Sequence, residues 1–126
     1  MEDSRELVMP TYLVLMKLTE HGVRNILNAP ARIEEAIQAF EAVGGKVTGF
    51  YAVMGEYDFC SIVEGPSDEI VMSFSLALSA AGNVRTTSLK AFTKEQFDRA
   101  VRQLDRLGTL AKMTDLPDLE SVETER

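Results

Sequence analysis

Three short segments of the chain carry the residue types from which a binding or catalytic site could be built. The segments are LTEHG at 18–22, GEYD at 55–58 and GNVRT at 82–86, and their candidate side chains are Glu20, His21, Tyr57, Asp58, Asn83 and Arg85. Histidine and aspartate exchange protons in general acid–base catalysis, and arginine stabilises a negative charge. His21 and Asp58 are therefore the catalytic candidates, and all six residues are candidates for binding a ligand.

GEYD also has a purely structural interpretation. Gly55 provides a permissive backbone for a turn, and Asp58 commonly fixes such a turn by accepting backbone N–H groups. We further expect Asp58 to pair with Arg85 and to tie the turn to the next part of the chain. The turn would then be a fold element first and the wall of a site second.

The spacing of apolar residues predicts the elements that position these segments. The predicted order is a strand at 11–18, a helix from Asn28 to Gly44-Gly45, strands at 46–54 and 58–64, a helix opened by Ser67 and ended by Gly82, and a strand at 84–92. This β-α-β-β-α-β order is typical of the ferredoxin-like α+β fold, with an antiparallel sheet in the order 4-1-3-2. In that sheet the three polar segments share one edge. Because one strand separates Asp58 from Arg85, their backbones are expected about 10 Å apart.

A third, C-terminal helix is predicted after these six elements. Thr93 and Gln96 form a capping box at its start. Its apolar face would carry Phe97, Val101, Leu104 and Leu107. The chain thus divides into an N-terminal extension at 1–8, one domain at 9–112 and an acidic tail at 113–126.

The first predicted strand, TYLVLMKL, is apolar on both faces. In this fold the first two helices cover one face of the sheet, so the other face needs a cover of its own. We expect a two-fold homodimer, or a higher homo-oligomer, with facing sheets and the third helix at the edge. The alternative is a monomer whose third helix covers the open face.

Composition and charge exclude several classes of function. Three acids and one arginine give residues 1–8 a charge of −2, and five acids and one arginine give residues 114–126 a charge of −4, which leaves −1 of the total of −7 for the body. A nearly neutral body with an acidic tail argues against nucleic acid as a partner. No apolar run could span a membrane, and a single cysteine, Cys60, suits a reducing compartment, so a cytoplasmic protein is expected.

No sequence motif indicates a metal or a cofactor. The chain has one histidine and one cysteine, far apart, which do not make up a zinc site. It has neither a Gly-x-Ser-x-Gly elbow nor a Gly-x-x-x-x-Gly-Lys phosphate loop. We therefore expect no cofactor.

Three stretches of the sequence resemble the signature segments of the GYD-domain family, named for its Gly-x-Tyr-Asp turn. They are MPTYLVLMKLTEHG, GGKVTGFYAVMGEYDF and GNVRTTSLKAFT, and the resemblance runs from about Met9 to Phe97. It implies membership of the dimeric α+β barrel group, which agrees with facing sheets. That group includes cofactor-free oxygenases, isomerases and ligand-sensing domains, so the resemblance assigns no activity.

Three functions remain open at this point. The first is a binding or sensing module that holds a small polar or anionic metabolite near His21, Asp58 and Arg85. The second is a cofactor-free enzyme, of isomerase or oxygenase type, that uses the same residues. The third is a protein whose role is assembly, through the face of its sheet.

Overall fold

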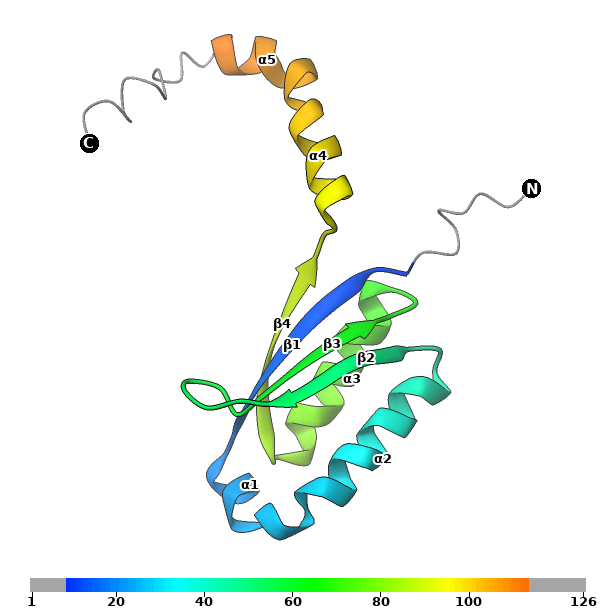
Figure 1. Ribbon diagram of the computed structural model, residues 1–126, viewed down its shortest axis with the longest axis vertical. Coiled ribbons are helices and arrows are strands. Elements are labelled where there is room, and N and C mark those ends of the chain that lie inside the picture. The colour runs from blue at the N-terminus through cyan, green and yellow to red at the C-terminus, as the bar shows by residue number, and fades with distance from the viewer. Residues whose placement is uncertain (1–8, 114–126) are drawn as a thin grey trace. The chain divides into compact units, whose positions relative to one another are not determined.

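The structure is a computed structural model that describes residues 9–113, with side chains described as far as Gly108. The predicted extension at 1–8 and the tail residues 114–126 lie outside the described residues. The chain divides into two compact units, the first ending at Ala91 and the second starting at Phe92, and each is described by itself (Figure 1).

The first unit is a four-stranded antiparallel sheet with helices. Its elements are β1 (Thr11–Leu18), α1 (Glu20–Arg24), the 3-10 turn η2 (Ile26–Asn28), α2 (Ala29–Ala42), β2 (Lys46–Ala52), β3 (Phe59–Glu64), α3 (Asp68–Ala81) and β4 (Val84–Ala91). The strand order is β2-β3-β1-β4, which confirms the predicted order. Helix α1 was not predicted, because its five residues are too few for an apolar period. It is started by Thr19, whose hydroxyl accepts the Gly22 N–H at 3.0 Å.

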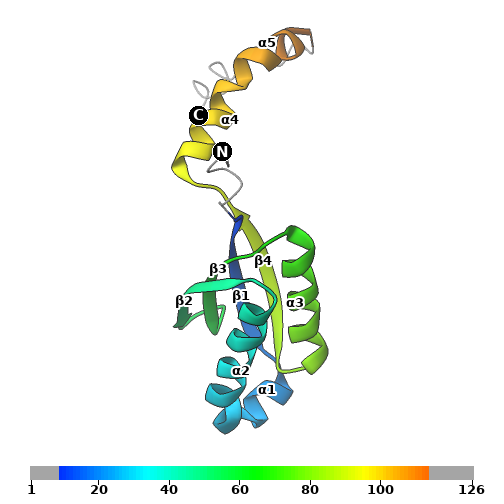
Figure 2. The same ribbon diagram turned by 90° about the vertical axis from the view of Figure 1, so that its right-hand side faces the viewer.

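The core of this unit lies between the sheet and two helices. Figures 1 and 2 show α2 and α3 on the same side of the sheet. The buried core side chains are Tyr12, Val14, Met16, Phe40, Val63 and Val71. The helical spacing of apolar residues in the two predicted helices also places Val43 and Ala77 on the buried stripes, but both are exposed. Val43 follows the end of α2, and Ala77 lies to one side of the stripe that α3 turns toward the sheet.

The opposite face of the sheet, called here the open face, is also apolar. Leu13 and Leu15 of β1 point to it, and their cross-strand partners on β3 and β4 are Ile62, Cys60, Leu89 and one polar residue, Thr87. Tyr51 of β2, opposite Cys60, extends the same surface. Within residues 9–91 no helix lies over it (Figure 2). The prediction that β1 is apolar on both faces is therefore confirmed.

The second unit contains α4 (Lys94–Arg102) and α5 (Leu104–Met113), where a single helix was predicted. The capping box is present, because the Thr93 N–H donates to Gln96 Oε1 at 2.7 Å and the Gln96 N–H donates to Thr93 Oγ1 at 3.0 Å. Helical structure continues past Gly108, since Ala111, Lys112 and Met113 have high helix propensity. The predicted apolar face is exposed: Phe97 is 63% exposed and Leu104 is 58% exposed.

A hydrogen-bonded group at the far end of β1 joins the sheet to α3. The Tyr12 hydroxyl donates to the Asp68 carboxylate, which also accepts from Lys90 Nζ at 3.1 Å. Burial, followed by the hydrogen bond to Asp68 and its negative charge, raises the pKa of Tyr12 to about 12. The hydrogen bonds from Tyr12 and Lys90 lower the pKa of Asp68.

The raised pKa of Tyr12 predicts a loss of stability at high pH. The unfolded chain ionises this phenol near pH 10, and the folded chain retains its proton to about pH 12. The unfolded state therefore binds fewer protons in this interval, so stability falls as pH rises through it. We expect the melting temperature to fall less in Tyr12→Phe than in the unmodified protein between pH 10 and 12.

Tyr57→Phe is the control, since Tyr57 is half-buried in the loop between β2 and β3 and donates no hydrogen bond within the described residues. Its thermal melts should follow those of the unmodified protein. If the melting temperature falls equally at alkaline pH in the unmodified protein and in Tyr12→Phe, Tyr12 is not the group that titrates.

Candidate binding site

The three polar segments are linked through their backbones at one edge of the sheet. The Leu18 N–H donates to Asp58 Oδ2 at 2.8 Å, and the Thr19 N–H donates to the Asn83 carbonyl at 3.0 Å. Helix α1 lies so close to the connection between α3 and β4 that a Cβ on Gly22 would be 2.1 Å from the Asn83 carbonyl oxygen. Glycine is thus required at position 22. The end of β1 joins both the hairpin and the start of β4.

The Asp58 side chain fixes the hairpin to the neighbouring strand, while within the hairpin the Asp58 backbone carbonyl accepts the Val53 N–H at 2.9 Å. Its carboxylate accepts the Leu18 N–H, and its own N–H donates to the Met16 carbonyl at 2.9 Å. The expectation that the Asp58 side chain would bond N–H groups of its own turn is therefore corrected. Gly55 has a φ of +122°, which supports the interpretation of GEYD as a turn.

Arg85 does not pair with Asp58. Its cross-strand partner is Lys17, and no carboxylate of the described residues lies within 4.0 Å of its guanidinium. The Asp58 carboxylate instead accepts the Leu18 N–H at 2.8 Å. Two like charges, Lys17 and Arg85, therefore stand side by side at this end of the open face.

Glu20 and His21 lie on α1 and are exposed to solvent. Glu20 forms an ion pair with Arg24 at 2.9 Å, one turn along the helix. His21 has the Asn25 side-chain amide as its neighbour, at 3.4 Å from Nε2. The edge thus brings the six predicted residues into one region without enclosing His21 or Arg85 in a pocket.

Metal-binding and membrane-spanning features were also searched in the described chain. Residues 9–113 contain no group of three or more His, Cys, Asp or Glu side chains that could hold a metal ion. None of the helices within this range is long and apolar enough to cross a lipid bilayer.

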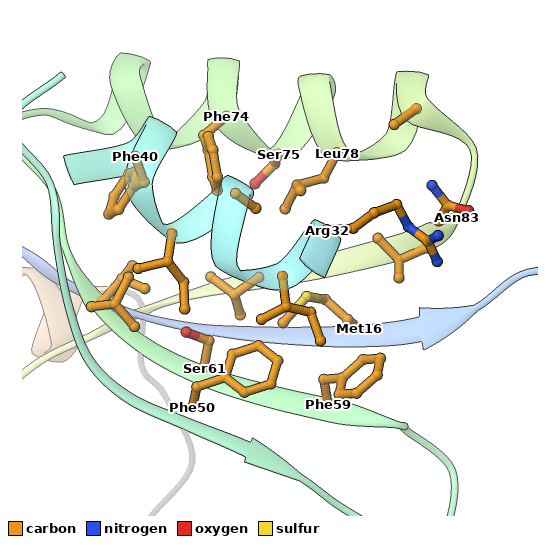
Figure 3. A pocket seen from close by; sticks show the side chains of 18 of the residues that line it. Met16, Arg32, Phe40, Phe50, Phe59, Ser61, Phe74, Ser75, Leu78 and Asn83 are labelled. Atoms are coloured by element: carbon orange, nitrogen blue, oxygen red, sulfur yellow. The ribbon is translucent and has the colours of Figure 1, made fainter. Parts of the chain in front are cut away.

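A cavity of about 350 Å³ lies between the sheet, α2 and α3 (Figure 3). Its floor consists of sheet side chains that include Met16, Phe50 and Phe59, and its walls come from the two helices. One end is closed by Phe40 of α2 and Phe74 of α3, whose ring centroids are 4.8 Å apart. We call this space the helix–sheet cavity.

The other end of the helix–sheet cavity is polar. Figure 3 shows Arg32 of α2 and Asn83 at the end opposite Phe40 and Phe74. Arg32 Nη1 donates to the Asn25 carbonyl at 3.2 Å, and no carboxylate of residues 9–108 forms an ion pair with it. Asn83 Oδ1 is buried and has no hydrogen-bond partner in the described part of the chain.

The sequence analysis selected Asn83 but missed Arg32. Arg32 lies directly before Ile33, the first residue of the apolar stripe of α2, and a charged residue at the margin of such a stripe is the signal that could have found it. Such margins are usually solvated, so the signal is weak. Ser61, on the cavity floor, is buried and donates to the Gly49 carbonyl at 3.1 Å.

The bond between Asp58 and Leu18 predicts how substitutions at this edge change stability. Asp58→Ala leaves the Leu18 N–H without its partner, and we expect it to lower the free energy of unfolding by about 1–3 kcal/mol. Asp58→Asn keeps a carbonyl oxygen that accepts the same N–H, so it should cost clearly less. Arg85→Ala removes an exposed side chain without an ion pair and should cost about 0.5 kcal/mol or less.

Chemical denaturation of the three variants measures these free energies. The order Asp58→Ala, Asp58→Asn, Arg85→Ala, from the largest loss to the smallest, is the expected result. A loss in Arg85→Ala equal to that in Asp58→Ala would show that the two side chains depend on each other.

One relative is similar to this chain over about two thirds of its length. A Thermus thermophilus protein named glutamine synthetase and cystathionine beta-lyase binding protein is 39% identical over 84 residues, which cover 66% of this chain and 88% of the relative.

Two solved structures share the fold of this chain. LrpC from B. subtilis matches 75% of this chain with a TM-score of 0.53 at 16% identity, and an AsnC family transcriptional regulator from Agrobacterium tumefaciens matches 75% with a TM-score of 0.51 at 20% identity. The match spans 59% and 57% of those chains, and at these identities it shows the fold alone.

The family comparison agrees with the resemblance seen in the sequence. The model of the GYD domain matches residues 12–101, from β1 to the end of α4. This span includes the hairpin, the three linked segments and every residue that lines the helix–sheet cavity. The chain therefore belongs to the GYD domain family.

Proposed function

We propose that this protein is a binding module that self-associates through the open face of its sheet and holds partner proteins in the assembled form. The proposal rests on an apolar surface that no helix of residues 9–91 covers. It is made by Leu13, Leu15, Tyr51, Ile62 and Leu89. Tyr51 is 58% exposed and Leu89 is 46% exposed. Contiguous apolar surface of this kind marks an interaction site.

A second copy of the same chain is the occupant that the charges favour. Lys17 and Arg85 form a basic end of the open face, and Glu64, at the other end of the sheet, points to the same face between its cross-strand partners Thr11 and Lys46. A two-fold axis perpendicular to the strands would place the basic end of one copy against Glu64 of the other. In this arrangement each copy makes the same contacts with the other, as in an isologous interface.

The relative from Thermus thermophilus supports binding of proteins as the role of the assembly. Its printed name describes it as a binding protein for two enzymes, glutamine synthetase and cystathionine beta-lyase. We propose that this chain likewise binds an enzyme of amino-acid metabolism. The catalytic alternative receives less support from the geometry, because His21 is exposed and Asp58 is engaged by a backbone N–H.

Self-association through the open face predicts the effect of a charge at its centre. Leu13→Glu would bury two carboxylates in the interface, and we expect it to convert a dimer into a monomer. Leu76→Glu makes the same change on α3, where Leu76 is 64% exposed, and should leave the dimer intact. Sedimentation equilibrium at micromolar concentration measures both. A monomeric unmodified protein, or equal dissociation of the two variants, would contradict the interface.

The proposed binding of an enzyme can be tested separately from self-association. Purified glutamine synthetase and cystathionine beta-lyase from the same organism should bind the immobilised unmodified protein. Leu13→Glu should bind more weakly than Leu76→Glu if the partner requires the dimer. Absence of binding to both enzymes, with the dimer intact, would reject the partner class and leave self-association standing.

A further inference from the structure

The helix–sheet cavity is too large to be an ordinary packing defect. Protein interiors are packed like organic crystals, and voids larger than a water molecule are few. A cavity of about 350 Å³ that is partly open to solvent falls in the range of ligand pockets.

The shape of the cavity follows from the packing of its two helices. Phe40 is 1% exposed and holds α2 against α3 through Phe74. Beyond this pair the helices contribute small lining side chains, Ala36 on α2 and Ser75 and Ala81 on α3, together with the larger Ile33 and Leu78. The sheet floor beneath includes Val14, Met16 and Leu18, from a stretch of five strand residues that extends about 13 Å. The space is therefore elongated, apolar along its length and polar at one end.

The polar end specifies the head group of an occupant. Arg32 has five N–H donors, of which the described contacts use one, and it forms no ion pair with a carboxylate of residues 9–108. A guanidinium in this state favours a carboxylate, which it binds through two parallel hydrogen bonds. Asn83 Oδ1 is a buried acceptor with no partner, and such a group is costly unless an N–H or O–H reaches it.

We propose that the helix–sheet cavity binds a small carboxylic acid with an apolar chain and with a hydroxyl or amino donor next to the carboxylate. The carboxylate lies on Arg32, the adjacent donor lies on Asn83 Oδ1, and the apolar chain extends toward Phe40 and Phe74. Glu35 also lines the cavity, one turn after Arg32, and its negative charge limits the affinity for an anion. This site lies on the opposite side of the sheet from the open face, so it does not depend on self-association.

Four probes of matched chain length test the head group. They are 2-hydroxyoctanoate, 2-aminooctanoate, octanoate and 1-octanol, each titrated into the unmodified protein by calorimetry and by methyl NMR. We expect the two substituted acids to bind more tightly than octanoate, and octanoate more tightly than octanol. If none of the four binds at millimolar concentration, or if octanol binds as well as the acids, the proposal is overturned.

Substitutions at the polar end test the two residues separately. Arg32→Gln should weaken the binding of the acids by about tenfold or more, because it removes a charge-assisted hydrogen bond. It should leave the affinity for octanol unchanged. Asn83→Leu should remove the advantage of the substituted acids over octanoate. Glu35→Gln should strengthen the binding of 2-hydroxyoctanoate and octanoate, which carry a net negative charge. Arg24→Gln, an exposed arginine on α1, is the control and should change none of the affinities. Equal effects of Arg32→Gln and Arg24→Gln would overturn the assignment of Arg32.

A cavity-filling variant tests the space itself. Ala36→Leu places a larger side chain in the cavity and should abolish binding of all probes while keeping or raising the melting temperature. Ala39→Leu makes the same change on the exposed side of α2 and should bind as the unmodified protein does. If α2 instead closes onto α3 in solution, Ala36→Leu would be overpacked and destabilised and no probe would bind, which would overturn the proposal.

Discussion

The architecture depends on one constraint, the position of β1 at the centre of the sheet with apolar side chains on both of its faces. β1 pairs with β3 on one side and with β4 on the other, so all of its backbone groups between Thr11 and Met16 lie within the sheet. One set of its side chains, Tyr12, Val14 and Met16, is buried by α2 and α3. The other set, Leu13 and Leu15, reaches the open face. Because the side chains of a strand alternate, the same eight residues that build the core also create the unpartnered surface.

Helices α2 and α3 cover one face of the sheet and leave the other face open, and each face provides a binding surface. On the helical side, the aromatic pair of Phe40 and Phe74 holds α2 and α3 at one end, and the small side chains beyond it leave the helix–sheet cavity with Arg32 and Asn83 at its mouth. On the open side, a second copy is the cover that the charge pattern favours. The end of β1 connects the two sides, because Leu18 is held by Asp58, and Thr19 is held by the backbone of Asn83, whose side chain lines the cavity.

The strands, their order and the main helix ends could be predicted because each rests on a local pattern. Alternating apolar residues, the N-cap Ser67 and the capping box of Thr93 and Gln96 act within a few residues of sequence, and the structure contains them all. The predicted Asp58–Arg85 pair failed because topology fixes only which strands are neighbours. It does not show that the Leu18 N–H takes the carboxylate first. The cavity could not be predicted either, since the distance between α2 and α3 depends on how side chains distant in sequence pack together.

The central claim is that a second copy covers the open face, and the reactivity of Cys60 tests it most directly. Cys60 is the only cysteine of the chain, is half-buried and lies opposite Leu15 on that face. The measurement is the rate at which a bulky maleimide modifies the native protein across a dilution series from high to low micromolar concentration. Covering by a second copy predicts slow modification at high concentration and faster modification on dilution. A rate that is the same at every concentration would contradict the account.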